Sequence, residues 1–112
     1  EDLIIFGDGK HQRDYVYVSD VVEFTINSMT FDTPSTFNVG RGIPVTVNQV
    51  FEVFKSHDSD QKNPIIKPER FGEIGSFYCD VSNAMITGWN PKIDLKQGIS
   101  MTINFFTKNR ND

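Results

Sequence analysis

The sequence is poor in the residues on which disulfide, metal and nucleophilic chemistry depends. Its 112 residues include one cysteine, Cys79, and two histidines, His11 and His57, which stand far apart. One cysteine cannot close an internal disulfide, and isolated histidines lack the spacing of a metal site. Because neither histidine has a nucleophile placed near it by a local element, a Ser/His/Asp or Cys/His hydrolase is disfavoured. A reducing, cytoplasmic setting fits this composition.

Long apolar runs and an excess of positive charge are also missing. No stretch approaches the roughly 20 apolar residues of a membrane span, and the start carries no basic signal region. Eleven Lys and Arg against fifteen Asp and Glu give a net charge of −4, which disfavours binding to nucleic acid or to a membrane surface. The length allows one core. Since the chain begins at Glu1 rather than Met, we expect 1–112 to be a single-domain piece of a longer protein.

The order of element signals predicts a mixed α/β fold. Strands are expected over 3–6 and 13–18, and the glycines of the Gly7-Asp8-Gly9-Lys10 turn between them suit a tight connection. We therefore expect these two strands to pair as a β-hairpin. The other short strands or extended segments are expected at 36–39, 64–67 and 77–79.

Two capping-box patterns mark the clearest helix starts. Thr46 is followed three residues on by Gln49, and Asp94 by Gln97, and apolar residues then recur at helical spacing as far as Phe106. Two further helices are expected. One is capped by Ser19-Asp20 and has an apolar face of Val22, Ile26 and Met29, widened by Val21 and Phe24. The other is a short helix from Ser82 that Gly88 closes.

Two of the four arginines stand where a freely solvated charge has no obvious use. Arg13 opens a hydrophobic strand, and Arg70 precedes a loop with two glycines. A planar guanidinium offers five donors to phosphate oxygens, so two of them on different elements can bind a diphosphate. From spacing alone the alternative stays open that these arginines form ion pairs with acidic residues of the chain, namely Asp14, Asp80 or Glu73.

Four ordered motifs carry a resemblance to a known family. They are IFGDGKHQRDYVYVSDVV (5–22), FNVGRG (37–42), RFGE (70–73) and DVSNA through GWNP (80–91). In this order they resemble segments of the NAD-dependent epimerase/dehydratase family, the extended short-chain dehydrogenases, whose members include nucleotide-sugar epimerases such as UDP-glucose 4-epimerase. The resemblance covers about 5–106 and implies that the chain is the C-terminal, substrate-binding part of such an enzyme.

The resemblance assigns roles to five residues. Arg13 and Arg70 would bind the substrate diphosphate, and Glu73 would hydrogen-bond the ribose hydroxyls. Asn38 would lie near the nucleotide, with a polar side chain that satisfies the following glycine turn as the alternative. Phe77 would line the sugar pocket, with a plain core phenylalanine as the alternative.

The chain carries neither a Tyr-x-x-x-Lys motif nor a complete dinucleotide fingerprint, and its glycine pairs have the spacing of turns. The resemblance therefore implies that NAD and the catalytic groups belong to a Rossmann part outside 1–112, and that 1–112 alone is inactive. The expected partners are a nucleotide diphosphate sugar and that Rossmann part, and a homodimer of the parent enzyme stays open. A stand-alone, non-catalytic module that binds nucleotide sugars or proteins is the alternative.

Overall fold

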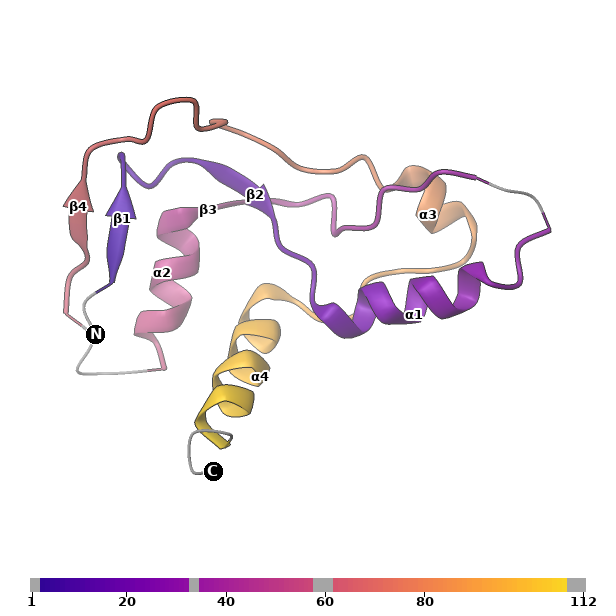
Figure 1. Ribbon diagram of the computed structural model, residues 1–112. Helices are drawn as coiled ribbons and strands as arrows, with labels where there is room; N and C mark the ends of the chain where they lie inside the picture. The colour runs from indigo at the N-terminus through magenta and orange to yellow at the C-terminus, as the bar shows by residue number, and fades with distance from the viewer. Residues whose placement is uncertain (1–2, 33–34, 58–61, 109–112) are drawn as a thin grey trace.

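The computed structural model describes residues 3–32, 35–57 and 62–108. Within these ranges the strands are β1 (Ile4–Phe6), β2 (Gln12–Asp14), β3 (Pro44–Thr46) and β4 (Ile65–Lys67), and the helices are α1 (Val18–Ser28), α2 (Val47–Lys55), α3 (Ser82–Ile86) and α4 (Leu95–Lys108). The predicted mixed α/β fold is confirmed. The molecule is elongated, 50 × 38 × 21 Å, with β1, β4 and α2 at one end and α1 and α3 at the other (Figure 1).

The described strands form two separate pairs. β1 pairs with β4 in parallel, and β2 pairs with β3 in antiparallel orientation, with Arg13 opposite Val45. The β-hairpin expected between 3–6 and 13–18 is therefore wrong. Each of these segments finds its partner far along the chain rather than across the turn.

The predicted turn between β1 and β2 forms, but it hydrogen-bonds to the start of α2 and does not close a hairpin. Gly7 and Gly9 both have positive φ, as the sequence predicts. The first two amides of α2, those of Val47 and Asn48, donate to the carbonyls of His11 (3.1 Å) and Gly9 (3.0 Å). Because these amides have no partner within their own helix, the turn satisfies them and is fixed against α2.

Two other expectations about strands differ from the structure. The segment 36–39 is irregular, because Phe37 and Val39 pack against the aromatic core instead of joining a sheet. The segment 77–79 is irregular too, and a single bridge between Gln12 and Ser76 precedes it. The strand expected at 64–67 is confirmed as β4.

The capping-box predictions are confirmed. Thr46 Oγ1 accepts from the Gln49 amide at 3.1 Å, while Gln49 Oε1 accepts from the Thr46 amide at 2.8 Å. Asp94 Oδ1 likewise accepts from the Gln97 amide at 2.8 Å at the start of α4. After α3, Gly88 adopts a φ of +90° and ends the turn as expected. Of the described helices, none combines the length and the apolar character that crossing a membrane requires.

The start and the buried face of α1 differ from the prediction. The helix begins at Val18, and neither Ser19 nor Asp20 caps it. Asp20 is instead buried, and its Oδ2 accepts from the amide of Ile93 at 3.0 Å. Of the predicted apolar face, Phe24 is buried, whereas Val22, Ile26 and Met29 are exposed. Val18, at the start of the helix, is exposed as well.

An aromatic core lies at the α1 and α3 end of the molecule. Its buried members are Phe24, Ala84 and Trp89, and Phe31, Phe37 and Val39 pack against them. The Phe24 ring meets the rings of Phe37 and Trp89 edge-on, each with centroids 5.3 Å apart. Trp89 Nε1 donates to the Asp20 carbonyl at 3.1 Å, so the one polar group of the buried indole has a hydrogen-bond partner.

Candidate functional site

The loop over residues 68–77, here called the arch, connects β4 to the segment that leads to α3 (Figure 1). All of its residues are exposed. At its start the Gly7 amide donates to the Lys67 carbonyl at 2.9 Å, and near its end the Gln12 amide donates to the Gly75 carbonyl at 2.8 Å. The Phe77 amide then donates to the Gln12 carbonyl at 3.0 Å. The arch is thus attached at both ends beside β2, the strand that carries Arg13.

Arg13 and Glu73 meet between β2 and the arch. Arg13 Nη2 lies 3.8 Å from Glu73 Oε1, and each side chain is about a third exposed. Arg13 Nη1 also donates to the Gln12 carbonyl at 2.7 Å. Of the ion pairs considered from spacing, the structure forms the one with Glu73. The guanidinium keeps further N–H donors beyond these two contacts.

Arg70 and Phe77 lie on the same arch. The Arg70 guanidinium stacks over the Phe6 ring at the end of β1, with Cζ 3.7 Å from the ring centroid. Because this contact uses the face of the guanidinium, its N–H groups at the edge remain available. Phe77 is 58% exposed, so it is not a core phenylalanine of this chain.

Asn38 lies in a different contact. Its Nδ2 donates to the Asp80 carbonyl at 3.2 Å, which connects the segment before Gly40 to the start of α3 rather than to the arch. The Asp80 carboxylate accepts from the Ser82 hydroxyl at 2.6 Å and the Ser82 amide at 3.0 Å. These two bonds hold the pKa of Asp80 below its ordinary value of 3.8.

Asp14 has a structural role that the sequence analysis did not assign. Its carboxylate accepts from the backbone amides of Arg41 and Gly42, both at 2.9 Å, and of Cys79 at 3.3 Å. A Cβ on Gly40 would fall only 2.5 Å from Asp14 Oδ2, which explains the glycine there. The sequence signal for this contact was the pair Gly40 and Gly42, because glycine lets backbone amides approach a carboxylate closely.

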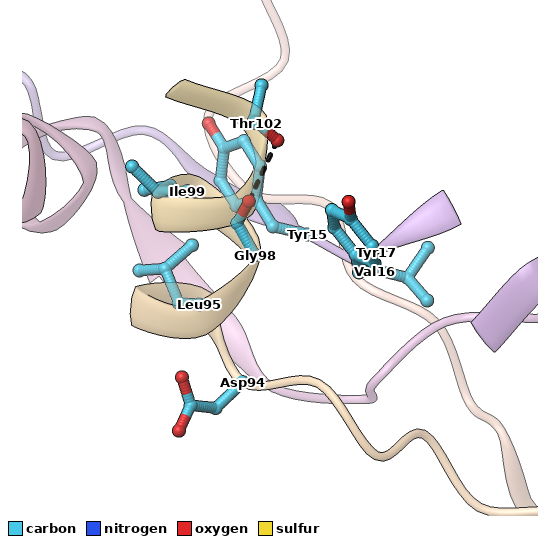
Figure 2. A pocket seen from close by; sticks show the side chains of 8 residues that line it. All are labelled: Tyr15, Val16, Tyr17, Asp94, Leu95, Gly98, Ile99 and Thr102. Atoms are coloured by element: carbon cyan, nitrogen blue, oxygen red, sulfur yellow. Dashed lines mark hydrogen bonds between the residues drawn. The ribbon is translucent and has the colours of Figure 1, made fainter. Parts of the chain in front are cut away.

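A small apolar pocket lies apart from the arch, between the segment 15–17 and α4 (Figure 2). It has a volume of about 130 Å³, and its lining residues include Tyr15, Tyr17 and Gly98. Pockets for small-molecule ligands usually measure about 300–1,000 Å³, so this one is too small for a nucleotide sugar. None of the five predicted site residues lines it.

Comparison with known proteins identifies the family to which this mixed α/β chain belongs. The model of the family described as GDP-mannose 4,6 dehydratase matches residues 1–102. The chain belongs to this family, and the resemblance to NAD-dependent epimerases and dehydratases is confirmed.

Two curated relatives illustrate the match. A putative UDP-glucose 4-epimerase of Methanocaldococcus jannaschii is 36% identical over 95% of this chain and 34% of its own length. The UDP-glucose 4-epimerase of Mycolicibacterium smegmatis is 33% identical over 91% of this chain and 33% of its own length. The chain therefore spans about a third of the length of these relatives.

Solved structures give the same picture. The UDP-glucose 4-epimerase of Thermotoga maritima with UDP-glucose aligns with a TM-score of 0.92 and 39% identity, over 97% of this chain and 36% of that one. The UDP-glucose 4-epimerase of Bifidobacterium longum with NAD+ and UDP aligns with a TM-score of 0.86 and 25% identity, over 99% and 36%.

Proposed function

We propose that this chain is the nucleotide-sugar-binding part of an NAD-dependent epimerase or dehydratase, in which Arg13 and Arg70 bind the substrate diphosphate. The observation that carries the proposal is the pairing of Arg13 with Glu73 of the exposed arch, which also holds Arg70. It is supported by the likeness to an epimerase structure that contains UDP-glucose.

The free donors of the two arginines suit a diphosphate. Arg13 is held by Glu73 and by the Gln12 carbonyl, which fixes its direction and leaves N–H groups for phosphate oxygens. Arg70 offers the edge of its guanidinium from the arch while its face rests on Phe6. Glu73 supplies acceptors for ribose hydroxyls, and the exposed Phe77 supplies an apolar surface for the sugar. Asn38 is a weaker candidate, because its amide is already used by Asp80.

Binding of this kind assists a reaction that happens elsewhere on the substrate. A nucleotide sugar is mostly nucleotide, so interactions with its diphosphate and ribose can hold the sugar ring in a reactive position. The arginines act as positioning groups, because a guanidinium carries only hydrogen-bond donors and no acceptor that could take a proton from the substrate. Epimerisation, dehydration and decarboxylation can all use such a site, since relatives of this chain include UDP-glucuronic acid decarboxylases as well as epimerases.

The residues that the structure describes do not form an NAD site by themselves. The turn after β1 leads into β2 and caps α2, whereas a dinucleotide fingerprint opens a helix directly. We propose that NAD and the catalytic groups are held by the remaining two-thirds of a parent protein with the length of its relatives.

The outer face of α1 supports such a neighbouring part. Val18, Val22, Ile26 and Met29 follow one another at helical spacing and are all exposed. A continuous apolar stripe of this kind usually marks a surface that another part covers. We propose that the Rossmann part of the parent enzyme packs on it.

The coding DNA upstream of Glu1 gives the first test. A continuous reading frame of about 150–200 further residues, with a glycine-rich dinucleotide fingerprint and Tyr-x-x-x-Lys, is expected. A start codon immediately before Glu1 would overturn the enzyme assignment and favour a stand-alone binding module.

The arginines are tested in the full-length protein. We expect Arg13→Ala and Arg70→Ala each to weaken the binding of UDP or GDP by about 2–5 kcal/mol, measured by calorimetry, because each removes one side of a charged contact. Lys92→Ala is the matched control, since Lys92 pairs with Glu23 at the other end of the molecule, and it should leave the affinity unchanged. Unchanged affinity in both arginine variants would contradict the proposal.

A further inference from the structure

We infer that His11 is a positioning residue, which holds the first half of the arch through Glu69 and thereby sets the place of Arg70. The inference rests on the proposed function, because it takes Arg70 as a ligand of the diphosphate. It concerns a contact outside the five site residues that the sequence analysis predicted.

A hydrogen bond joins the two segments that carry the arginines. His11 Nε2 lies 2.9 Å from Glu69 Oε1. His11 stands two residues before Arg13, and Glu69 stands directly before Arg70. The His11 side chain is only 12% exposed although it belongs to a surface turn, whereas Glu69 is 59% exposed. The His11 imidazole is therefore largely buried, and the Glu69 carboxylate of the arch lies against it at hydrogen-bond distance.

The surroundings place the His11 ring beneath the arch. A Cβ on Gly7 would lie 3.6 Å from both His11 Cε1 and the Glu69 side chain, and a Cβ on Gly75 would lie 4.0 Å from His11 Cδ2. The ring thus lies near the start and near the end of the arch together. On its other side, the His11 carbonyl accepts from the first amide of α2. His11 therefore contacts the arch through its imidazole and the start of α2 through its carbonyl.

The rest of the arch has few attachments. Its backbone hydrogen bonds to neighbouring segments are at Lys67, Gly75 and Phe77, which leaves the part around Arg70 between them. There the Arg70 ring contact and the Arg13–Glu73 pair act, and the 3.8 Å between Arg13 Nη2 and Glu73 Oε1 is too long for a hydrogen bond that would fix the arch. A segment with few buried contacts opens locally at low cost. The His11–Glu69 bond is the contact that restrains the residue next to Arg70.

The inference does not require a charged imidazole. A neutral ring with its proton on Nε2 donates to a carboxylate, as does the doubly protonated ring. The charged groups near His11 are Glu69 from the arch and, in its own turn, Asp8, which is paired with Lys10. The contact therefore acts as a fixed support for the arch.

The test measures the affinity of the full-length protein for UDP or GDP, whichever the unaltered protein binds more tightly. We expect His11→Ala and Glu69→Ala each to weaken binding about three- to tenfold, and the double variant to weaken it no further than either alone. His11→Gln keeps an amide donor and should recover most of the loss. In an Arg70→Ala background, His11→Ala should have no further effect, because the group that it positions is gone.

The outcomes separate the two proposals. If His11→Ala binds normally while Arg13→Ala and Arg70→Ala do not, the positioning role is wrong and the proposed function stands. If His11→Ala weakens binding equally with and without Arg70, His11 acts on the whole fold and the inference is again wrong. If both arginine variants bind normally, the proposed function itself fails. Glu69→Ala lies at an exposed position and supplies the same test should His11→Ala fail to fold.

Discussion

The two ends of the molecule both hold aromatic and acidic side chains but use them in opposite ways. At the α1 and α3 end, Phe24 and Trp89 are buried edge-on against each other. At the arch end, Phe71 and Phe77 are exposed. The same residue type thus supplies a core at one end and a solvent-facing surface at the other, which is the division expected between a scaffold and a recognition loop.

The acidic residues divide in the same way. Asp20 is buried and accepts from a backbone amide of the segment before α4, so its carboxylate joins two parts of the scaffold. Glu69 and Glu73 are exposed or half-exposed, and their partners are His11 and Arg13. The scaffold end should therefore govern unfolding, and the arch end should govern binding.

The largest expected effect compares two Phe→Ala substitutions. Phe24→Ala should lower the free energy of unfolding of the chain by about 3–5 kcal/mol, because it empties the centre of the aromatic core. Phe71→Ala removes the same atoms from a fully exposed position and should change the free energy of unfolding by less than about 0.5 kcal/mol. Urea denaturation followed by tryptophan fluorescence measures both, since Trp89 touches Phe24. Equal losses would break the division between the two ends.

The next effect concerns the buried carboxylate. Asp20→Ala should lower the free energy of unfolding by about 1–3 kcal/mol, because it leaves the Ile93 amide without its acceptor. Asp20→Asn keeps an acceptor oxygen and should cost clearly less, and the same denaturation experiment compares them. If both variants lost the same amount, the hydrogen bond to Ile93 would not explain the burial of Asp20.

Helix starts could be predicted from the sequence because their signals are local. The caps at Thr46 and Asp94 need only a partner three residues away, and both form. The hairpin failed for the opposite reason: β1 and β2 find partners that begin about 60 and 30 residues further along, and no local pattern encodes such pairings. Apolar periodicity also found a face of α1 but could not say that Phe24, and not Val22, is buried.

The site shows the same limit. The chemistry of guanidinium singled out Arg13 and Arg70, and Glu73 was among the partners considered for them. The three backbone amides on Asp14 and the ring of His11 under the arch depend on loops 27 to 65 residues away, so residue types alone did not reveal them. Gly98 is a similar case. Glycine costs a helix about 1 kcal/mol relative to alanine, but a Cβ there would lie 3.2 Å from the Tyr17 ring.

The smallest expected effect depends on pH and compares one carboxylate from each end. The pKa of Asp80 is lowered first by the Ser82 hydroxyl, and that of Asp8 first by the Lys10 amide. A carboxyl whose pKa is lower in the folded chain stabilises it above the ordinary value of 3.8, and this contribution is lost as the pH falls through the folded pKa. Asp80→Asn and Asp8→Asn should therefore melt slightly below the unaltered chain at pH 7, and the difference in melting temperature should close toward pH 3.

Because Asp80 lies just before α3 beside the aromatic core while Asp8 lies in the turn at the arch end, we expect this difference to be larger for Asp80. A difference that stays constant between pH 7 and pH 3 would show that neither charge acts through these bonds, and a larger difference for Asp8 would place more of the folding stability at the arch end than its exposure implies.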